Sequence, residues 1–418
     1  MAQTANQIDV RKVLLISASG RVADFTYIYS NITMRESMSM TAITGSITVE
    51  DDHDHFEILP IIGQEDLRIE VEVLGEPYVF AFRAYKISEI QKVSARNSQY
   101  TLYFVSHEMV RNEKNRVSRS YSNTLYSTMI RDILESDIET TKPISVVTTE
   151  NDATHVVPNV RPFRAINQIA RKCISEVDGL SNYVFFEDKR GFIAAPMSAF
   201  LTNKPKYTYR YMENVGPGGA NEYINDPLVI NKLDMAKQSD SLDLLNRGFF
   251  ASQLHSVDIL QRKIDVYDYN YFDLFDEMKH INRYPLFFAQ EDFDVEGQQY
   301  FTYSNETAVD NAYVTDNDSA FTPDLSSQFR ARRMIQNMMF SNYVINMSIT
   351  GNPLLNIGDI IDIDLIANAN QREERQHNML AGKSMVTAIT HVIGSGRSYF
   401  QRVETVKDSV SRDLEEAI

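Results

Sequence analysis

Alternating apolar and polar residues mark several strands towards the end of the chain. Residues 343–350 and 361–365 alternate in this way, which is typical of strands with one buried face and one solvated face. Residues 385–393 and 399–405 continue the pattern, and turns that contain glycine separate the runs. The four strands predict an antiparallel meander that closes into a small barrel.

The first 107 residues also have the composition and alternation of a β domain. The clearest strand is 67–73, where leucine, isoleucine and valine alternate with charged residues. The other extended runs complete a set of strands large enough for a barrel: 12–16, 24–31, 37–43, 46–50, 79–90 and 100–105.

The two β regions have features in common. Ile90 and Tyr100 are ten positions apart, and so are Ile389 and Tyr399, on either side of a predicted turn in each case. Residues 69–72 and 361–364 share one alternating pattern that ends in a carboxylate. These similarities predict that one barrel occurs twice, with residues 1–107 forming the first copy.

Residues 108–205 predict a compact α/β domain between the barrels. Ser122 or Asn123 can cap a first helix, and a second helix begins at Pro162, a favoured first helical residue, and ends near Gly179. The predicted strands of this domain are 144–148, 183–187 and 192–194.

The remaining residues predict a second barrel that is interrupted by an insertion. Residues 206–265, with strands at 226–233 and 249–266, form its first part, and residues 336–405 form its second part. Residues 266–335, aromatic at first and then polar, form the insertion. The fold class is therefore a β-rich α+β multidomain protein: two similar antiparallel β-barrels, an intervening α/β domain and an insertion in the second barrel.

Residues 406–418 predict a short amphipathic tail. Val406, Val410 and Leu414 recur at every fourth position, so a helix would place them on one face. This face either packs onto the chain's own barrel or binds a neighbouring protein. The three residues are the candidate partner-binding residues.

Composition limits the possible function classes. The 418 residues are 43% hydrophobic, and no apolar run approaches the roughly 20 residues of a membrane span. A net charge of −16 argues against a dedicated nucleic-acid-binding protein, because such proteins need a basic face. It suits a surface that DNA passes without binding, although solubility alone also explains it. The single cysteine, Cys173, excludes an internal disulfide.

No group of residues predicts catalysis or metal binding. The Asp/His cluster at 51–55 has potential metal ligands, but its position between a strand and a loop favours a solvated turn. The carboxylate pairs Glu65/Asp66 and Asp362/Asp364 lack a recognisable apolar pocket, and His391 fits a packed strand interior. We therefore predict no catalytic, cofactor-binding or metal-binding residue, no cofactor and no enzymatic activity.

Four stretches carry a family resemblance. Residues 351–365, GNPLLNIGDIIDIDL, and residues 380–409, LAGKSMVTAITHVIGSGRSYFQRVETVKDS, resemble the last barrel of central baseplate hub proteins of contractile-tailed phages. A related barrel occurs in type VI secretion spike proteins. Residues 46–73 and 246–269 also fit the resemblance, which covers most of the chain outside 266–335.

The resemblance implies a structural hub in the tail baseplate of the virion, assembled in the host cytoplasm. Three chains would form a ring of six similar barrels that joins the six-fold tail tube to the three-fold central spike. The implied partners are further copies of the chain, the spike protein, tube or tube-initiator proteins and baseplate wedge proteins. DNA would contact the ring only in transit through its channel. The alternatives are a tail-associated cell-wall or carbohydrate hydrolase and a hub of a bacterial contractile injection machine.

Overall fold

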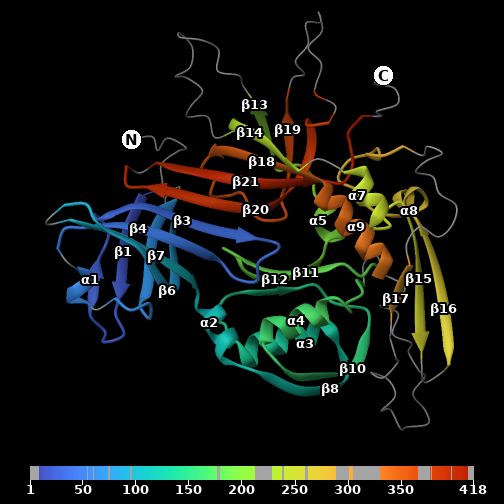
Figure 1. Cartoon of the computed structure of the whole chain (residues 1–418), viewed down its shortest axis with the longest axis horizontal. Coiled ribbons are helices and arrows are strands. Elements are labelled where there is room, and N and C mark those ends of the chain that lie inside the picture. The colour runs from blue at the N-terminus through green and yellow to red at the C-terminus, as the bar shows by residue number, and fades with distance from the viewer. Residues whose placement is uncertain are drawn as a thin grey trace, which may run out of the picture.

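A computed structural model gives the fold of the chain as two β units, a middle domain and a side domain (Figure 1). It describes residues 9–412 except 54, 60, 74–75, 95–96, 177–178, 212–227, 238–239, 259–261, 289–300, 305–329, 366–376, 378 and 397. Among the described residues, no helix is long and apolar enough to cross a membrane.

The first β unit is a curved antiparallel sheet formed by residues 9–106. Its strands follow the spatial order β3-β4-β7-β6-β5-β1-β2 and enclose a core around Phe25, Tyr100 and Phe104. Its elements are β1 (Asp9–Ile16), β2 (Val22–Asp24), β3 (Tyr29–Ser37), β4 (Thr44–Asp51), α1 (His55–Ile58), β5 (Asp66–Val73), β6 (Glu76–Lys92) and β7 (Ser98–Ser106).

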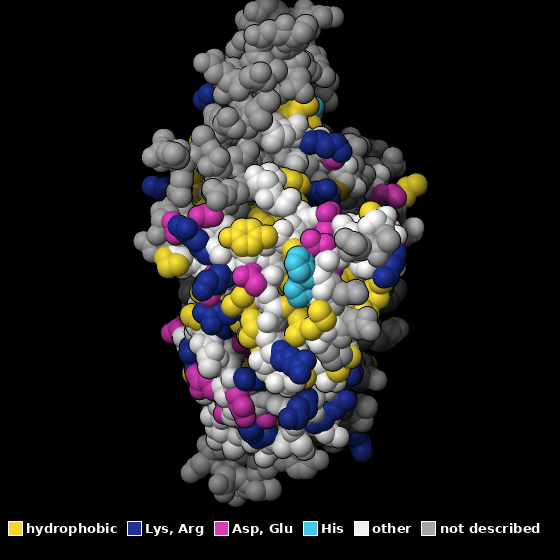
Figure 2. Space-filling view, turned by 90° about the vertical axis from the view of Figure 1, so that its left-hand side faces the viewer, with side chains coloured by type: hydrophobic (Ala, Val, Ile, Leu, Met, Phe, Trp, Pro, Cys, Tyr) yellow, Lys and Arg dark blue, Asp and Glu magenta, His cyan; other side chains and the backbone are white. Residues whose placement is uncertain are grey.

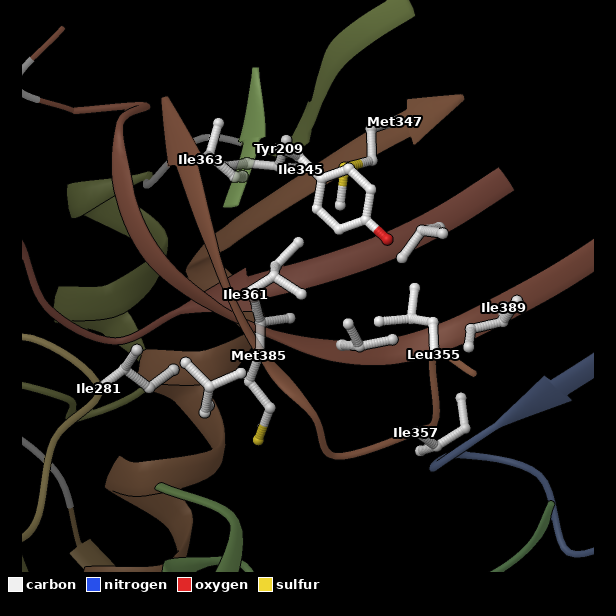
Figure 3. Packing of buried hydrophobic residues seen from close by; sticks show 14 of the residues in the cluster. Tyr209, Ile281, Ile345, Met347, Leu355, Ile357, Ile361, Ile363, Met385 and Ile389 are labelled. Carbon is white, nitrogen blue, oxygen red and sulfur yellow. The ribbon is translucent and has the colours of Figure 1, made fainter. Parts of the chain in front are cut away.

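The second β unit is a closed six-stranded barrel. Its strands pair in the order β14-β18-β21-β20-β19-β13, and β13 closes the ring by pairing in parallel with both β19 and β14. Figure 3 shows its interior, where side chains such as Ile345, Ile361 and Met385 converge. Its strands are β13 (Tyr207–Tyr211), β14 (Val229–Lys237), β18 (Tyr343–Thr350), β19 (Ile360–Asp364), β20 (Gly382–Gly394) and β21 (Tyr399–Lys407).

The middle domain, residues 107–201, packs two helices against two small β-sheets beneath the β units (Figure 1). Its core contains Met129, Ile166 and Phe192. Its elements are α2 (His107–Lys114), β8 (Val117–Leu125), α3 (Tyr126–Asp132), the π-helical turn η1 (Ile133–Asp137), β9 (Ile144–Val146), β10 (Asp152–Val160), α4 (Pro162–Ala170), β11 (Tyr183–Asp188), β12 (Gly191–Pro196) and α5 (Ser198–Leu201).

The side domain lies between β14 and β18 in the sequence and has an aromatic core that includes Phe249, Phe250 and Tyr271. Its helices border the barrel, and its hairpin extends away from it (Figure 1). Its elements are α7 (Ser241–Asn246), β15 (Ala251–Asp258), β16 (Lys263–Asn270), α8 (Tyr271–Glu277), β17 (Phe301–Ser304) and α9 (Arg330–Asn342).

The two β units are joined into a single 13-stranded sheet. Residues 31–37 of β3 pair antiparallel with residues 388–394 of β20. Ile393 and Tyr399 of the barrel lie in the core of the first β unit, and Met38 of the first unit lies in the barrel core. The units therefore share their interiors as well as their backbone hydrogen bonds.

The prediction of two similar barrels is not confirmed, because the described strands of only one unit form a closed ring. β2 and β3 do not pair with each other in the described part of the first unit. In addition, β1 is antiparallel to its neighbour β5, whereas β13 is parallel to its neighbour β19. The proposed match of Ile90 with Ile389 also fails on burial, because Ile90 is 54% exposed and Ile389 is fully buried.

Five strands of each unit nevertheless share one order and one set of directions. The order β3-β4-β7-β6-β5 in the first unit corresponds to β14-β18-β21-β20-β19 in the barrel, with every pair antiparallel. Both long strands carry a β-bulge, at Tyr85 in β6 and at Thr387 in β20. Just before each bulge, a backbone amide donates to a carbonyl oxygen of the loop that leads into the previous strand. Ala84 N donates to Glu65 O before β5, and Val386 N donates to Asp359 O before β19, both at 2.9 Å.

Three local predictions are wrong. Residues 37–43 are not a strand, because the Met40 amide donates to Ser37 O and turns the chain after β3. Residues 249–266 form a hairpin, with a left-handed backbone at Arg262 (φ 54°). Ser122 and Asn123 belong to β8, and α3 begins only at Tyr126.

Candidate assembly surface

A concave groove runs across both β units on the face opposite their cores. It has a volume of about 850 Å³, and eight consecutive strands contribute to its lining, in the order β14-β18-β21-β20-β3-β4-β7-β6. Alternation places polar residues here: in β18, for example, Ile345 and Met347 are buried while Asn346 is exposed. Two strands outside the groove continue the sheet beyond the ends of this run: β13 pairs with β14, and β5 pairs with β6.

The groove carries charges of both signs. Lys232 lies 2.6 Å from Asp234 within β14, and Arg35 lies 3.9 Å from Glu404 between neighbouring parts of the sheet. Arg402 adds a third cation, and the other lining residues are mainly neutral and polar, including Thr33, Ser46, Ser348 and Thr390. The groove therefore lacks the concentrated positive charge that holds a nucleic-acid backbone.

A buried hydrogen-bond chain crosses the junction between the two β units. Gln401 Nε2 donates to the Tyr399 hydroxyl at 2.8 Å, and this hydroxyl lies 2.8 Å from Nδ1 of His391. Nε2 of His391 lies 3.0 Å from Glu36 Oε1 of β3. With His391 Nε2 as the donor to Glu36, every member of this chain has a hydrogen-bond partner.

The same chain extends to the middle domain and to the turn after β18. The Lys189 amide donates to Glu36 Oε2 at 2.9 Å, and Lys189 Nζ donates to Leu355 O at 2.6 Å. Asn352 Nδ2 donates to the Tyr209 hydroxyl at 3.1 Å. Three parts of the fold therefore meet at one polar centre, which specifies how they are oriented.

Electrostatics within this centre stabilise the Glu36 carboxylate. Burial of the carboxyl group raises its pKa, but the hydrogen bond from His391 and the charges of His391 and Lys189 outweigh this effect and hold the pKa of Glu36 below its usual value. Burial, with the nearby charge of Glu36, raises the pKa of Tyr399, so its hydroxyl stays protonated and available as a donor.

The structure brings two of the three predicted partner-binding residues into the chain's own core. Val406 is 5% exposed and belongs to the barrel core. Val410 is fully buried against Leu286 and Tyr343, and its backbone exchanges hydrogen bonds of 2.8 and 2.9 Å with Tyr284. Leu414 lies outside the described residues.

The predicted helix is therefore wrong over residues 406–412. Strand β21 continues to Lys407, and residues 408–412 are an irregular segment with an isolated bridge at Val410. Asp408 anchors this segment, because it accepts a hydrogen bond from the Ile281 amide at 3.1 Å and lies 2.9 Å from His280. A spacing of four residues fits one helical face, but a strand followed by a bend buries the same valines.

The Asp/His cluster at 51–55 is only partly the solvated turn that the sequence predicts. Asp51 is 1% exposed and accepts hydrogen bonds from the His53 amide and the Phe56 amide, both at 3.1 Å. Its other partners are His55 Nδ1 and the Tyr100 hydroxyl. Asp51 thus organises the start of α1, and the described residues contain no group of three or more His, Cys, Asp or Glu placed to hold a metal.

The other candidate groups have structural surroundings. Glu65 accepts hydrogen bonds from the amides of Ile62, Gly63 and Gln64, so it caps a turn. Asp362 and Asp364 occupy the outer, half-buried face of β19. Cys173 is buried, and burial raises the pKa of its thiol, which makes it unreactive.

Comparisons with known proteins link this architecture to phage tails. No family model matches the chain. The probable baseplate hub protein gp334 of Vibrio phage KVP40 is 18% identical over 379 residues, which are 88% of this chain and 87% of that protein. The tail protein from Neisseria meningitidis MC58 superposes with a TM-score of 0.57, at 10% identity over 95% of this chain and 96% of its own. The 43 kDa tail protein of prophage MuSo2 from Shewanella oneidensis superposes with a TM-score of 0.59, at 9% identity over 96% and 99%.

This chain has the fold of phage tail proteins. The resemblance to baseplate hub proteins that the sequence predicts is confirmed by the full-length match to the Vibrio phage protein. On the groove, the strands present alternating polar side chains on an open surface. The groove is therefore the candidate functional surface.

Sequence reasoning missed both the groove and the buried hydrogen-bond chain. Glu36 and His391 are 355 positions apart, so no local spacing connects them. The available signal was the placement of His391 and Gln401 at otherwise apolar positions of β20 and β21, where a buried polar residue needs a partner.

Proposed function

We propose that this chain is a structural hub of a contractile tail baseplate. Three copies form a ring that joins the six-fold tail tube to the three-fold central spike and leaves a channel for DNA. The observation that carries this proposal is the curved run of eight strands, which spans both β units, has a polar concave face and ends in the two strands β14 and β6. Three such runs placed end to end enclose a channel.

The similarity of the two β units supports the proposed symmetry. Five strands correspond in order and direction, and both long strands are bulged at the same place. A glycine of positive φ lies just before the strand that precedes each long strand: Gly63 (87°) before β5 and Gly358 (84°) before β19. Three copies of a chain with two related units present six related surfaces to a six-fold tube and three chains to the spike. The difference at β1 and β13 lies away from the groove.

The mixed charge of the groove supports its role as the channel wall. DNA in transit must not be held, and each phosphate contact by a lysine or arginine would release counterions and increase binding. In the groove, acidic neighbours lie close to Arg35 and Lys232. A channel wall of this kind, polar and close to neutral, would suit DNA in transit.

The proposed location is the tail baseplate of the virion, after assembly in the host cytoplasm. The partners are other copies of the chain, the central spike, the tail tube or its initiator proteins, and baseplate wedge proteins. The β15–β16 hairpin of the side domain extends away from the barrel (Figure 1), and in this proposal the side domain and the middle domain face the spike. In this role the chain acts without catalysis.

Mass and symmetry test the proposal. Light scattering of the purified chain, alone and with its spike partner, should show three copies, and electron microscopy should show a ring with a central opening. The map should place the groove on the channel side. A chain that stays monomeric with the spike present, or a ring with the groove outside, would overturn the hub proposal.

Two alternative functions remain distinguishable by experiment. A cell-wall or carbohydrate hydrolase should clear a peptidoglycan or glycan gel, and a single Asp or Glu substitution should abolish the clearing. A hub of a bacterial contractile injection machine should form the same ring but co-purify with bacterial sheath and tube proteins rather than with virions.

A further inference from the structure

The junction between β3 and β20 joins the two β units within one chain. Seven residues of β3 pair with seven residues of β20, just beyond the part of β20 that pairs with β19. The buried pair of Glu36 and His391 lies in this junction. In the correspondence of the two units, β3 matches β14, and β20 matches β6.

The strands that correspond to β20 and β3, which are β6 and β14, each have an edge segment without a strand partner in the described chain. β6 pairs with β5 only through residues 76–83. The Ala84 amide still donates to Glu65 O on that side, and no described strand pairs with residues 85–92 there. β14 pairs with β13 only at Val229 and Ile230, which leaves residues 231–237 without a described strand on that side. In the correspondence of the two units, the segment of β6 matches residues 388–394 of β20, and the segment of β14 matches residues 31–37 of β3.

Side chains on the β6 segment are exposed where their counterparts in β20 are covered. Tyr85 and Ile90 are 53% and 54% exposed, whereas His391, the counterpart of Ile90, is 9% exposed. Proteins usually protect an edge strand that carries exposed apolar residues, because it can pair with another chain. Figure 2 shows the end of the molecule formed by the first β unit, where hydrophobic side chains are interspersed with charges of both signs.

We infer that residues 231–237 of one copy pair antiparallel with residues 85–92 of the next copy. This contact repeats the junction of β3 with β20 between chains. It joins different surfaces of two copies, and such head-to-tail contacts form a ring when the rotation between copies closes. The inference rests on the proposed ring and specifies which two strand edges hold it together.

The correspondence also predicts the register. Thr33 pairs with Val392 in the junction. Its counterpart Asp234 faces Asn346 as Thr33 faces Ser46. Gln91 is the counterpart of Val392, because it faces Gln99 of β7 as Val392 faces Phe400 of β21. Asp234 of one copy should therefore lie opposite Gln91 of the next, within the Cα separation that a disulfide spans.

Cysteine cross-linking tests this pairing at two exposed positions. The double variant Asp234→Cys/Gln91→Cys is oxidised at assembly concentration and run on a non-reducing gel. The buried Cys173 provides little background. The matched control is Asp234→Cys/Tyr27→Cys, because Tyr27 is 93% exposed in the turn between β2 and β3. The reduced variants should melt at the wild-type temperature, which shows that they fold.

The expected result is a closed species of three cross-linked chains, at least tenfold more abundant than in the control. Reducing agent should separate it into single chains. A trimer by light scattering without cross-linking would overturn the strand pairing and leave the hub proposal standing. Cross-linked open chains of more than three copies would support the pairing and contradict the trimeric ring. A chain that stays monomeric and uncross-linked, with the spike present, would overturn both.

Discussion

The Glu36 carboxylate connects the junction between the β units to the middle domain. It is 2% exposed, and its two oxygens accept hydrogen bonds from His391 and from the Lys189 amide. Removal of one acceptor leaves a buried donor without a partner, which costs more than the net gain of an ordinary hydrogen bond.

Glu36→Gln should therefore destabilise the fold. Glutamine has one acceptor oxygen where the wild type has two, so we expect the free energy of unfolding to fall by about 1–3 kcal/mol in urea titrations. The control is Asp52→Asn, since Asp52 pairs with His53 on the surface and both side chains are more than half exposed. The control should change stability by less than about 0.5 kcal/mol, and equal effects of the two variants would contradict a special role for the junction.

A second buried charge predicts an unusual dependence on pH. The Lys407 side chain is fully buried and donates to the carbonyl oxygens of Leu380 and Ala381 at 2.9 and 2.6 Å. Burial lowers its pKa to about 7, against a smaller opposing effect of Asp362. Between pH 7 and the usual lysine pKa, the unfolded chain therefore binds more protons than the folded chain, and stability due to this group rises with pH.

Lys407→Met should remove that dependence. The wild type should gain stability over the variant as pH rises from 7 to 10, by at most about 1.4 kcal/mol per pH unit. Urea unfolding of both proteins at each pH measures the difference. A difference that stays constant across this range would show that Lys407 remains charged in the folded chain.

At the scale of elements, the segment after β21 belongs to the chain's own core. Val410→Asp should lower the free energy of unfolding by about 3 kcal/mol or more, because it places a carboxylate in the apolar cluster that contains Leu286 and Tyr343. Ser411→Asp is the control, since Ser411 is exposed. Thermal melts of the unassembled chain decide the matter. An unchanged melting temperature together with failed ring assembly would restore the partner-binding role of the valine.

Alternation of apolar and polar residues predicts the strands that have one solvated face. It fails where a strand is determined by pairing with residues far away in the sequence. It locates β5, β18, β19, β20 and β21 because each alternates over five or more residues. It misses β13, whose five residues YTYRY have little contrast, although this strand closes the barrel. Closure depends on parallel pairing with β19, about 150 residues away, which no local pattern encodes.

The candidate surface is even less visible in the sequence than the fold. Each groove residue is an ordinary polar residue on a strand, and only the order of eight strands from both units makes them one surface. The candidate residues Glu65 and His391 have structural surroundings: Glu65 caps a turn, and His391 lies 3.0 Å from Glu36.

At the scale of the whole molecule, the two β units are expected to depend on each other. A fragment of residues 1–107 lacks Ile393 and Tyr399, which complete its core, and leaves one edge of β3 unpaired along residues 31–37. We expect this fragment to be unfolded or aggregated, with amide signals in NMR spectra confined to the random-coil range. Fusion of residues 382–407 to the fragment through a flexible linker should restore signal dispersion. A well-dispersed spectrum of the fragment alone would contradict this dependence.

The contribution of Ile393 and Tyr399 to the first core also affects when the protein can fold during its synthesis. The ribosome makes the first β unit long before it makes β20 and β21, so the earliest part of the chain must wait for nearly the last. A chain that is cut short cannot present a finished first unit, and its unpaired β3 exposes it to chaperones and proteases. Only complete chains would then enter a ring in which a single defective copy breaks the symmetry.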